Sequence, residues 1–378
     1  MRRVAVGRVT VRLLSIGLTG FLAAEIGIRG ADALRGRGWN SPERRKVLDG
    51  SLFTAPRLFC QFRPPPGARY RVPGSEIRIN ALGLRGEEVS REKPQGVYRI
   101  LCLGGSTTFD AQNGADVHWP LLLERKLRAE FPDLLIEVLN AGANGWSSAH
   151  SLTYFLFDGL ALSPDLVIVY HNWNDLSVNF HGTPEPDYAN KYGLGEWDPR
   201  PETSRTALDR VLGWSQAYLF LRLKREALFP RLRRVEVKPY DPARGLPAEV
   251  YFRRNLESIC AVARTNGIRV VLGLQPQDIL RRLDKTIVTQ LGLGGSVSVP
   301  DAATLLSFHS RYLDVVRHVG SRWGAVVVDA AEAMSGRAEY FVDICHTTRA
   351  GSERLAEIFR EALVEEIRKS GVKSGTSQ

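Results

Sequence analysis

Two short segments near opposite ends of the chain carry residue types that can do nucleophilic and acid–base chemistry. Residues 104–106 read Gly-Gly-Ser after an apolar run, and such a turn leaves a serine hydroxyl accessible at the start of a helix. Residues 343–346 read Asp-Ile-Cys-His, where the aspartate can reach one ring nitrogen of His346 and leave the other as a base. Each segment alone also fits a plain turn or a surface histidine.

Two further segments could supply hydrogen-bond donors. Residues 140–147 hold small residues, including Gly145, that keep a backbone N–H accessible. Residues 170–175 hold a cluster of amides with Asn174, and such donors can stabilise a developing oxyanion. Asn174 or Asp175 fits a helix N-cap equally well. A phosphate-binding loop is a poor alternative at residues 104–106, because the Walker lysine is missing.

The pattern of apolar runs and helical periodicity predicts an α/β fold with a parallel sheet. Five short apolar runs are expected to be buried strands, at residues 100–103, 136–139, 166–170, 269–274 and 325–328. Amphipathic segments between and after them are expected to be helices, at residues 121–131, 251–264, 307–322 and 355–363. In such a sheet, function lies outside the carboxyl ends of the strands, so all four segments should meet on one rim.

Taken in their order along the chain, the segments at residues 104–106, 140–147, 170–175 and 343–346 resemble the sequence blocks of the SGNH (GDSL-type) hydrolases. Residues 104–106 resemble the Gly-Asp-Ser turn of the family, and Gly145 matches the glycine of the second block. Asn174 matches the asparagine of the third block, and Asp343 with His346 matches the final Asp-x-x-His. No Gly-x-Ser-x-Gly elbow is present, which argues against the α/β-hydrolase fold.

The resemblance extends over about residues 78–368 and departs from the family pattern at two positions. Gly105 stands where the family usually has aspartate, and Asn172 stands where glycine is expected. The lead-in at residues 80–86 also looks like that of membrane-anchored bacterial members. The fold implied is a flavodoxin-like three-layer sandwich around a five-stranded parallel sheet.

The resemblance implies a serine ester hydrolase, an esterase or O-deacetylase acting on an acylated envelope glycan, a lipid or a small ester. Ser106 would be the nucleophile, His346 its base and Asp343 the group that orients the imidazole. The oxyanion hole would combine the Ser106 and Gly145 backbone N–H groups with the Asn174 amide. Activity should fall below a pH of about 6.5 as the base protonates. An acyltransferase with the same triad and a non-catalytic membrane-anchored binding or assembly protein are the alternatives. No cofactor and no metal are expected.

The N-terminus resembles an uncleaved signal anchor. Four arginines precede an apolar stretch at residues 13–28 that only Glu25 interrupts. We therefore expect a single-pass transmembrane helix within residues 1–30 and a catalytic domain outside the cytoplasm. Further arginines after the stretch weaken the charge asymmetry that would set its orientation. An amphipathic helix lying on the membrane or on the domain is the alternative.

The rest of the chain divides by composition. Residues 31–95 are expected to be a linker with lead-in strands, since residues 64–67 read Pro-Pro-Pro-Gly. Residues 96–370 form the expected hydrolase domain, with insertions at about 181–247 and 276–302 beside the strand ends. The last eight residues, 371–378, are expected to be a disordered tail.

The charge and cysteine content disfavour a nucleic-acid partner and a zinc site. The chain has 51 Lys+Arg against 41 Asp+Glu, a net charge of +10. Because its basic residues do not alternate with aromatics in a compact patch, we expect a solvated basic surface and no nucleic-acid partner. The four cysteines lack metal-ligand or Cys-x-x-Cys spacing, which disfavours a zinc site. Neither the redox compartment nor the oligomeric state follows from the sequence.

Overall fold

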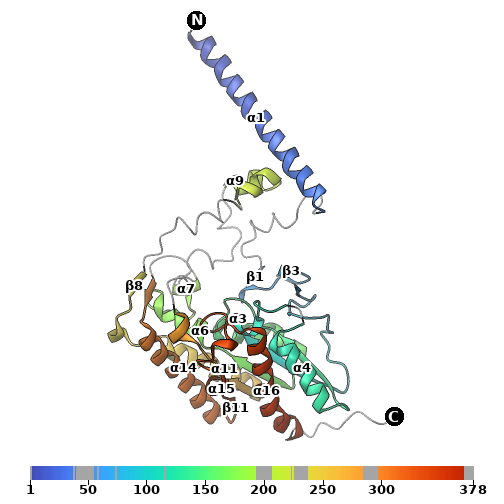
Figure 1. The fold of residues 1–378 in the computed structure, drawn as a ribbon, viewed down its shortest axis with the longest axis vertical. Helices are drawn as coiled ribbons and strands as arrows, with labels where there is room; N and C mark the ends of the chain where they lie inside the picture. The colour runs from blue at the N-terminus through green and yellow to red at the C-terminus, as the bar shows by residue number, and fades with distance from the viewer. Residues whose placement is uncertain are drawn as a thin grey trace. The chain divides into compact units, whose positions relative to one another are not determined.

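The structure is a computed structural model, and it divides into two compact units (Figure 1). Unit 1 comprises residues 1–56 and 199–234, and unit 2 comprises residues 57–198 and 235–378. The described residues are 2–36, 39, 55–57, 59–72, 75–114, 116–192, 207–222, 224, 237–283 and 297–369.

Unit 2 is built around a five-stranded parallel sheet. Its strands are β5 (Val97–Gly104), β6 (Leu135–Asn140), β7 (Leu166–Tyr170), β9 (Arg269–Gly273) and β11 (Val326–Val328). Their spatial order is β11-β9-β7-β5-β6, and every neighbouring pair is parallel. Counted along the chain this is the order 2-1-3-4-5, the doubly wound order of flavodoxin-like sheets. The predicted α/β class and all five predicted strands are confirmed.

Alternation along the strands explains why both faces of this sheet are covered. In β5, Ile100 and Cys102 face one apolar core, whereas Leu101 and Leu103 face the other. Because successive side chains of a strand point to opposite faces, a continuous apolar run supplies two cores at once.

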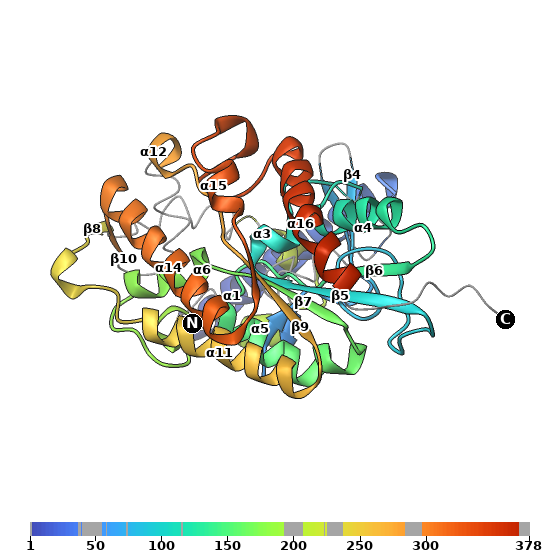
Figure 2. The ribbon, with the colours of Figure 1, turned by 90° about the horizontal axis from the view of Figure 1, so that it is seen from below.

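Helices cover the two faces of the sheet (Figure 2). On one face, α4 (Trp119–Glu130) packs against α16 (Arg349–Lys369). On the other, α11 (Glu249–Thr265) packs against α5 (Ser148–Tyr154) and α14 (Ala302–Trp323). The helices expected at residues 121–131, 251–264, 307–322 and 355–363 are therefore confirmed, with longer bounds.

Short elements complete unit 2. The antiparallel pair β3 (Arg69–Val72) and β4 (Ser75–Arg78) lies in the segment where lead-in strands are expected. Strand β8 (Val237–Pro239) pairs in parallel with β10 (Val297–Val299). The remaining short helices are α3 (Ser106–Phe109), α6 (Trp173–Leu176), α7 (Ala189–Tyr192), α12 (Ile279–Arg282) and α15 (Ala330–Met334). Strand β2 comprises Gln61–Arg63, and β1 comprises Ala55–Arg57 at the boundary between the units in the chain.

Unit 1 contains α1 (Arg2–Leu34) and α9 (Ala207–Leu212), and residues 216–222 are also helical. The Glu25 carboxylate of α1 accepts hydrogen bonds from the N–H groups of Gln216 and Ala217 at 2.9 and 2.8 Å. This carboxylate therefore caps the start of the second helical segment. Among the described residues, no helix is both long and apolar enough to cross a membrane, so the expected transmembrane helix is not found.

The two expected insertions are described only in part. Residues 193–206, 225–236 and 284–296 lie outside the described residues, as does the expected tail at 371–378. The division of the chain into anchor, linker and hydrolase domain stays a prediction.

Candidate active site

Ser106 lies in a tight turn at the carboxyl end of strand β5, which lies between β6 and β7 in the sheet. The strand ends at Gly104, and Ser106 opens the short helix α3. A Cβ on Gly104 would lie 2.0 Å from the Thr108 hydroxyl and 2.9 Å from the Tyr170 carbonyl oxygen. Only glycine therefore allows the chain to turn this closely against the neighbouring strand.

His346 and Asp343 reach this turn from the loop that precedes α16. His346 Nε2 lies 2.8 Å from Ser106 Oγ, and Nδ1 lies 2.7 Å from Asp343 Oδ2. The other carboxylate oxygen of Asp343 accepts the backbone N–H groups of Cys345 and His346, at 2.9 and 2.8 Å. The loop thus holds the carboxylate in place, and the three predicted residues form a continuous row.

The charges in this row favour a basic imidazole. Burial disfavours the charged ring, but Cys345 and Asp343 outweigh it, so the pKa of His346 lies well above its usual value. Burial likewise raises the pKa of Asp343, but the hydrogen bond from His346 and those from the loop N–H groups lower it below normal. In this row the Ser106 hydroxyl can pass its proton to Nε2, while the carboxylate stabilises the resulting imidazolium.

Of the predicted oxyanion donors, the Asn174 amide lies against the same turn, and two backbone N–H groups have no acceptor in the described part of the chain. Gly145 has φ +81°, a conformation that favours glycine. Among the described residues, no acceptor pairs with the Ser106 or the Gly145 backbone N–H. Asn174 Nδ2 donates to the Trp146 carbonyl at 2.9 Å, and it would lie 2.8 Å from a Cβ built on Gly105. Asn174 Nδ2 and the carbonyl of Trp146, the residue after Gly145, therefore lie against the turn that carries Ser106.

The two departures from the family pattern have local explanations. At position 105, a Cβ would lie 2.7 Å from the Trp146 carbonyl oxygen and 2.8 Å from Asn174 Nδ2, so glycine leaves room for the donor. At position 172, φ is −165°, an extended value that asparagine adopts as readily as glycine.

Several supporting residues were not predicted from the sequence. Arg85 donates to the backbone carbonyls of Phe109, Asp110, Asn113 and Gly114, which follow the nucleophile turn. The signal for Arg85 was its place in the lead-in block at residues 80–86.

Lys191 and Tyr192 are further supporting residues, and they come from the insertion after α6. Nothing in their spacing marks them, because this first part of the insertion has no helical or strand periodicity; the sequence indicates a helical piece only further on, around residues 214–228. Lys191 donates to the Asn174 side-chain oxygen at 3.2 Å, and the Tyr192 hydroxyl donates to the Gly145 carbonyl at 2.7 Å.

The same loop holds the one group of potential metal ligands found among the described residues. Atoms of Asp343, Cys345 and His346 lie within 4.8 Å of one another. His346 Nδ1 is, however, engaged with Asp343 at 2.7 Å, and burial raises the pKa of the Cys345 thiol. These features suit the Ser106 row better than metal ligation. A hollow of about 410 Å³ lined by Arg85, His118 and other residues includes no member of the row.

Fold and site together define an α/β protein with a serine, a histidine and an aspartate in a row at the rim of its parallel sheet. The sequence matches the model of the GDSL-like Lipase/Acylhydrolase family over residues 102–354, more than half of the chain. The chain belongs to this family of esterases, as its resemblance to the SGNH hydrolases implied.

Solved structures resemble the chain at low identity. A lipase/acylhydrolase from Enterococcus faecalis is 17% identical with a TM-score of 0.42, covering 71% of this chain and 96% of its own. An acetylxylan esterase from Geobacillus stearothermophilus is 15% identical with a TM-score of 0.41, covering 70% and 94%. No curated protein matches the sequence.

Proposed function

We propose that the protein is a serine ester hydrolase that acts through Ser106, His346 and Asp343. The observation that carries the proposal is the continuous row from Ser106 Oγ to His346 Nε2 at 2.8 Å and from Nδ1 to Asp343 at 2.7 Å. Nucleophile, base and orienting carboxylate are within the reach that proton transfer needs.

The mechanism follows from these contacts. Ser106 Oγ attacks the ester carbonyl while Nε2 takes its proton, and the tetrahedral intermediate collapses as His346 protonates the leaving alcohol. Water then attacks the acyl-enzyme and gives its proton to the same nitrogen. The Ser106 and Gly145 N–H groups and Asn174 Nδ2 stabilise the oxyanion. Each such donor contributes on the order of 3 kcal/mol to the transition state.

The proposed substrate is an acyl ester on an envelope glycan or a lipid. Ser106 and His346 are both part-exposed, so an ester carried on a bulky molecule can approach the nucleophile. An acyltransferase with the same triad is the second candidate, because the acyl-enzyme does not by itself select water over a sugar hydroxyl. A non-catalytic binding protein would have no need for the aligned row.

Hydrolysis of p-nitrophenyl acetate and of an O-acetylated glycan tests this proposal. We expect turnover by the wild type and a loss of about a thousandfold or more in Ser106→Ala and Asp343→Asn. Added glycan acceptors separate the two candidates, since a transferase would form acetylated acceptor faster than free acetate. A folded wild type without turnover on any ester would contradict the proposal.

We also propose that unit 1 attaches the protein to a membrane. In α1 a charged side chain is buried while apolar side chains are exposed, which is the opposite of a helix in water. Glu25 is 6% exposed, whereas Leu22 and Ile26 are 49% and 62% exposed. Trp214, just before the helical residues 216–222, is 58% exposed, and Leu221 within them is 65% exposed. A paired charge inside and apolar groups outside are stable against lipid rather than against water.

Flotation of the full chain with phosphatidylglycerol vesicles tests the attachment. The wild type should float, and a Leu22→Glu, Ile26→Glu double variant should remain at the bottom. Leu135→Glu is the matched control, because Leu135 is 65% exposed on β6 of unit 2 and should not affect flotation. Equal flotation of all three proteins would refute this attachment.

The proposed location of unit 2 is outside the cytoplasm, because a basic N-terminus precedes an apolar stretch. A periplasmic phosphatase fused to the C-terminus of the full chain should be active. An inactive phosphatase fusion together with an active fusion to a cytoplasmic reporter would contradict the proposed location of unit 2.

A further inference from the structure

The short helix α7 donates hydrogen bonds to oxygen atoms of two of the three residues that supply the proposed oxyanion donors. Lys191 Nζ donates to the Asn174 backbone carbonyl at 3.0 Å, to its side-chain oxygen at 3.2 Å and to Ser177 Oγ at 2.7 Å. The Tyr192 hydroxyl donates to the Gly145 carbonyl at 2.7 Å. Consecutive residues of one element thus bind Asn174 and Gly145, the two proposed donor residues that lie outside the turn of Ser106.

Lysine determines which end of the Asn174 amide faces the nucleophile. An amide can be turned over to exchange its oxygen and nitrogen, but an ammonium group has donors only. The atom next to Lys191 must therefore be the oxygen, which leaves Nδ2 toward Gly105 and the Trp146 carbonyl. The reversed amide would present an oxygen lone pair to the oxyanion and would repel it.

Tyr192 has the corresponding effect on Gly145. The donor of Gly145 is its backbone N–H, whose direction depends on a peptide with φ +81°. The hydroxyl bond to the carbonyl of the same residue fixes that turn from the other side. Tyr188, just before α7, donates to Asp175 at 3.0 Å, so the contact continues along the loop after β7.

Burial makes these contacts strong and expensive to lose. Lys191 is 6% exposed and Tyr192 is 1% exposed, and Lys191 also lies over the Tyr192 ring at 4.8 Å. Burial lowers the pKa of Lys191 to about 7, with Asp175 opposing the shift. The ammonium form has donors only, whereas the amine also carries a lone pair, so Lys191 fixes the orientation of the Asn174 amide most firmly in its charged form.

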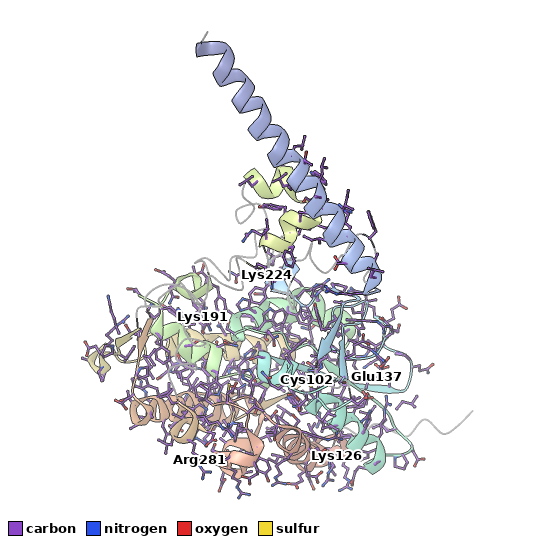
Figure 3. The ribbon with its side chains drawn as sticks, turned by 45° about the horizontal axis from the view of Figure 1, so that its top comes forward. Cys102, Lys126, Glu137, Lys191, Lys224 and Arg281 are labelled. Atoms are coloured by element: carbon purple, nitrogen blue, oxygen red, sulfur yellow. The ribbon has the colours of Figure 1, made fainter. Side chains whose placement is uncertain are left out.

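We propose that Lys191 and Tyr192 are positioning residues that orient the Asn174 amide and the Gly145 N–H toward the oxyanion. The inference rests on the proposed function, and it assigns part of the insertion at residues 181–247 to the catalytic rate. Lys191 is labelled in Figure 3 on the segment that carries α7.

The test measures p-nitrophenyl acetate turnover in full-chain variants, with the number of active sites taken from the p-nitrophenol burst. Lys191→Met should lower kcat about 10- to 100-fold with little change in KM, since the misplaced donor acts mainly in the transition state. Lys191→Gln should recover part of the loss, because its amide can still donate to Asn174. Tyr192→Phe should lower kcat about 3- to 10-fold.

Lys126→Met is the matched control, since this lysine lies on α4 and pairs with Glu357 at 2.7 Å (labelled in Figure 3). It should keep the wild-type kcat. A wild-type kcat per active site in Lys191→Met, even with a lowered Tm, would overturn the inference and leave the proposed function intact. A wild type without turnover would overturn both.

Discussion

Gly105 shows how one residue can be adapted to its neighbours. The family usually has aspartate here, yet the Trp146 carbonyl and Asn174 Nδ2 occupy the space that a Cβ would need. The residue at position 105 and the Asn174 donor therefore depend on each other. Introducing the family's usual aspartate at position 105 should impair catalysis in this chain.

Gly105→Asp should lower kcat by about tenfold or more, because the new side chain displaces Asn174 or the Trp146 peptide. Ala303→Asp is the control, since this exposed position in the first turn of α14 tolerates an acidic residue. Steady-state kinetics on p-nitrophenyl acetate measures the effect. A wild-type kcat in Gly105→Asp would show that Asn174 Nδ2 does not stabilise the oxyanion beside the turn at residues 104–106.

The pH dependence belongs to His346. A base must be neutral to accept a proton, so activity is lost as pH falls through its pKa. Because that pKa is raised above its usual value, the acid limb of kcat/KM should lie at a higher pH than the 6.5 of an ordinary histidine.

Measurement of kcat/KM between pH 5 and 10 checks this expectation. Asp343→Asn should move the remaining activity's acid limb to lower pH, because it removes the carboxylate that favours the charged ring. A wild-type limb at or below pH 6, or one that Asp343→Asn leaves in place, would contradict the assignment.

At the scale of elements, the loop after α3 depends on Arg85. This side chain is 3% exposed and donates to the backbone carbonyls of Phe109, Asp110, Asn113 and Gly114. Burial lowers the pKa of Arg85 to about 10, so it remains charged at neutral pH.

Arg85→Met should therefore destabilise the protein by about 3 to 5 kcal/mol, since buried carbonyls lose a charged donor. Thermal unfolding of the full chain followed by circular dichroism measures the loss. Arg78→Met is the comparison, because Arg78 forms exposed ion pairs with Glu76 and Glu87 and should alter Tm little. Similar Tm values for the two variants would contradict a special role of Arg85.

The elements also show what the sequence could predict. Strands such as β7 were predictable because five consecutive apolar residues must be buried on both faces. The partners of Asn174 were not, because α7 has only four residues and lies in a segment without periodicity. The contacts of α7 with Asn174 and Gly145 are tertiary contacts that form only in the folded chain, and no local sequence pattern predicts them.

At the scale of the whole molecule, the sheet joins residues that are far apart in the chain. Ser106 and His346 are 240 positions apart, yet their side chains are 2.8 Å apart. The strand order places β5 between β6 and β7, and the turn after β5 meets the loop before the last helix. An activated serine is thus a property of the complete fold of unit 2.

Fluorophosphonate labelling of the full chain tests the central claim most directly, because the probe reacts covalently with an activated serine. Wild type should be labelled, with the adduct mapped by mass spectrometry to Ser106. Ser106→Ala, His346→Ala and heat-unfolded wild type should not be labelled. Equal labelling of the variants, or no labelling of a folded wild type, would contradict the account.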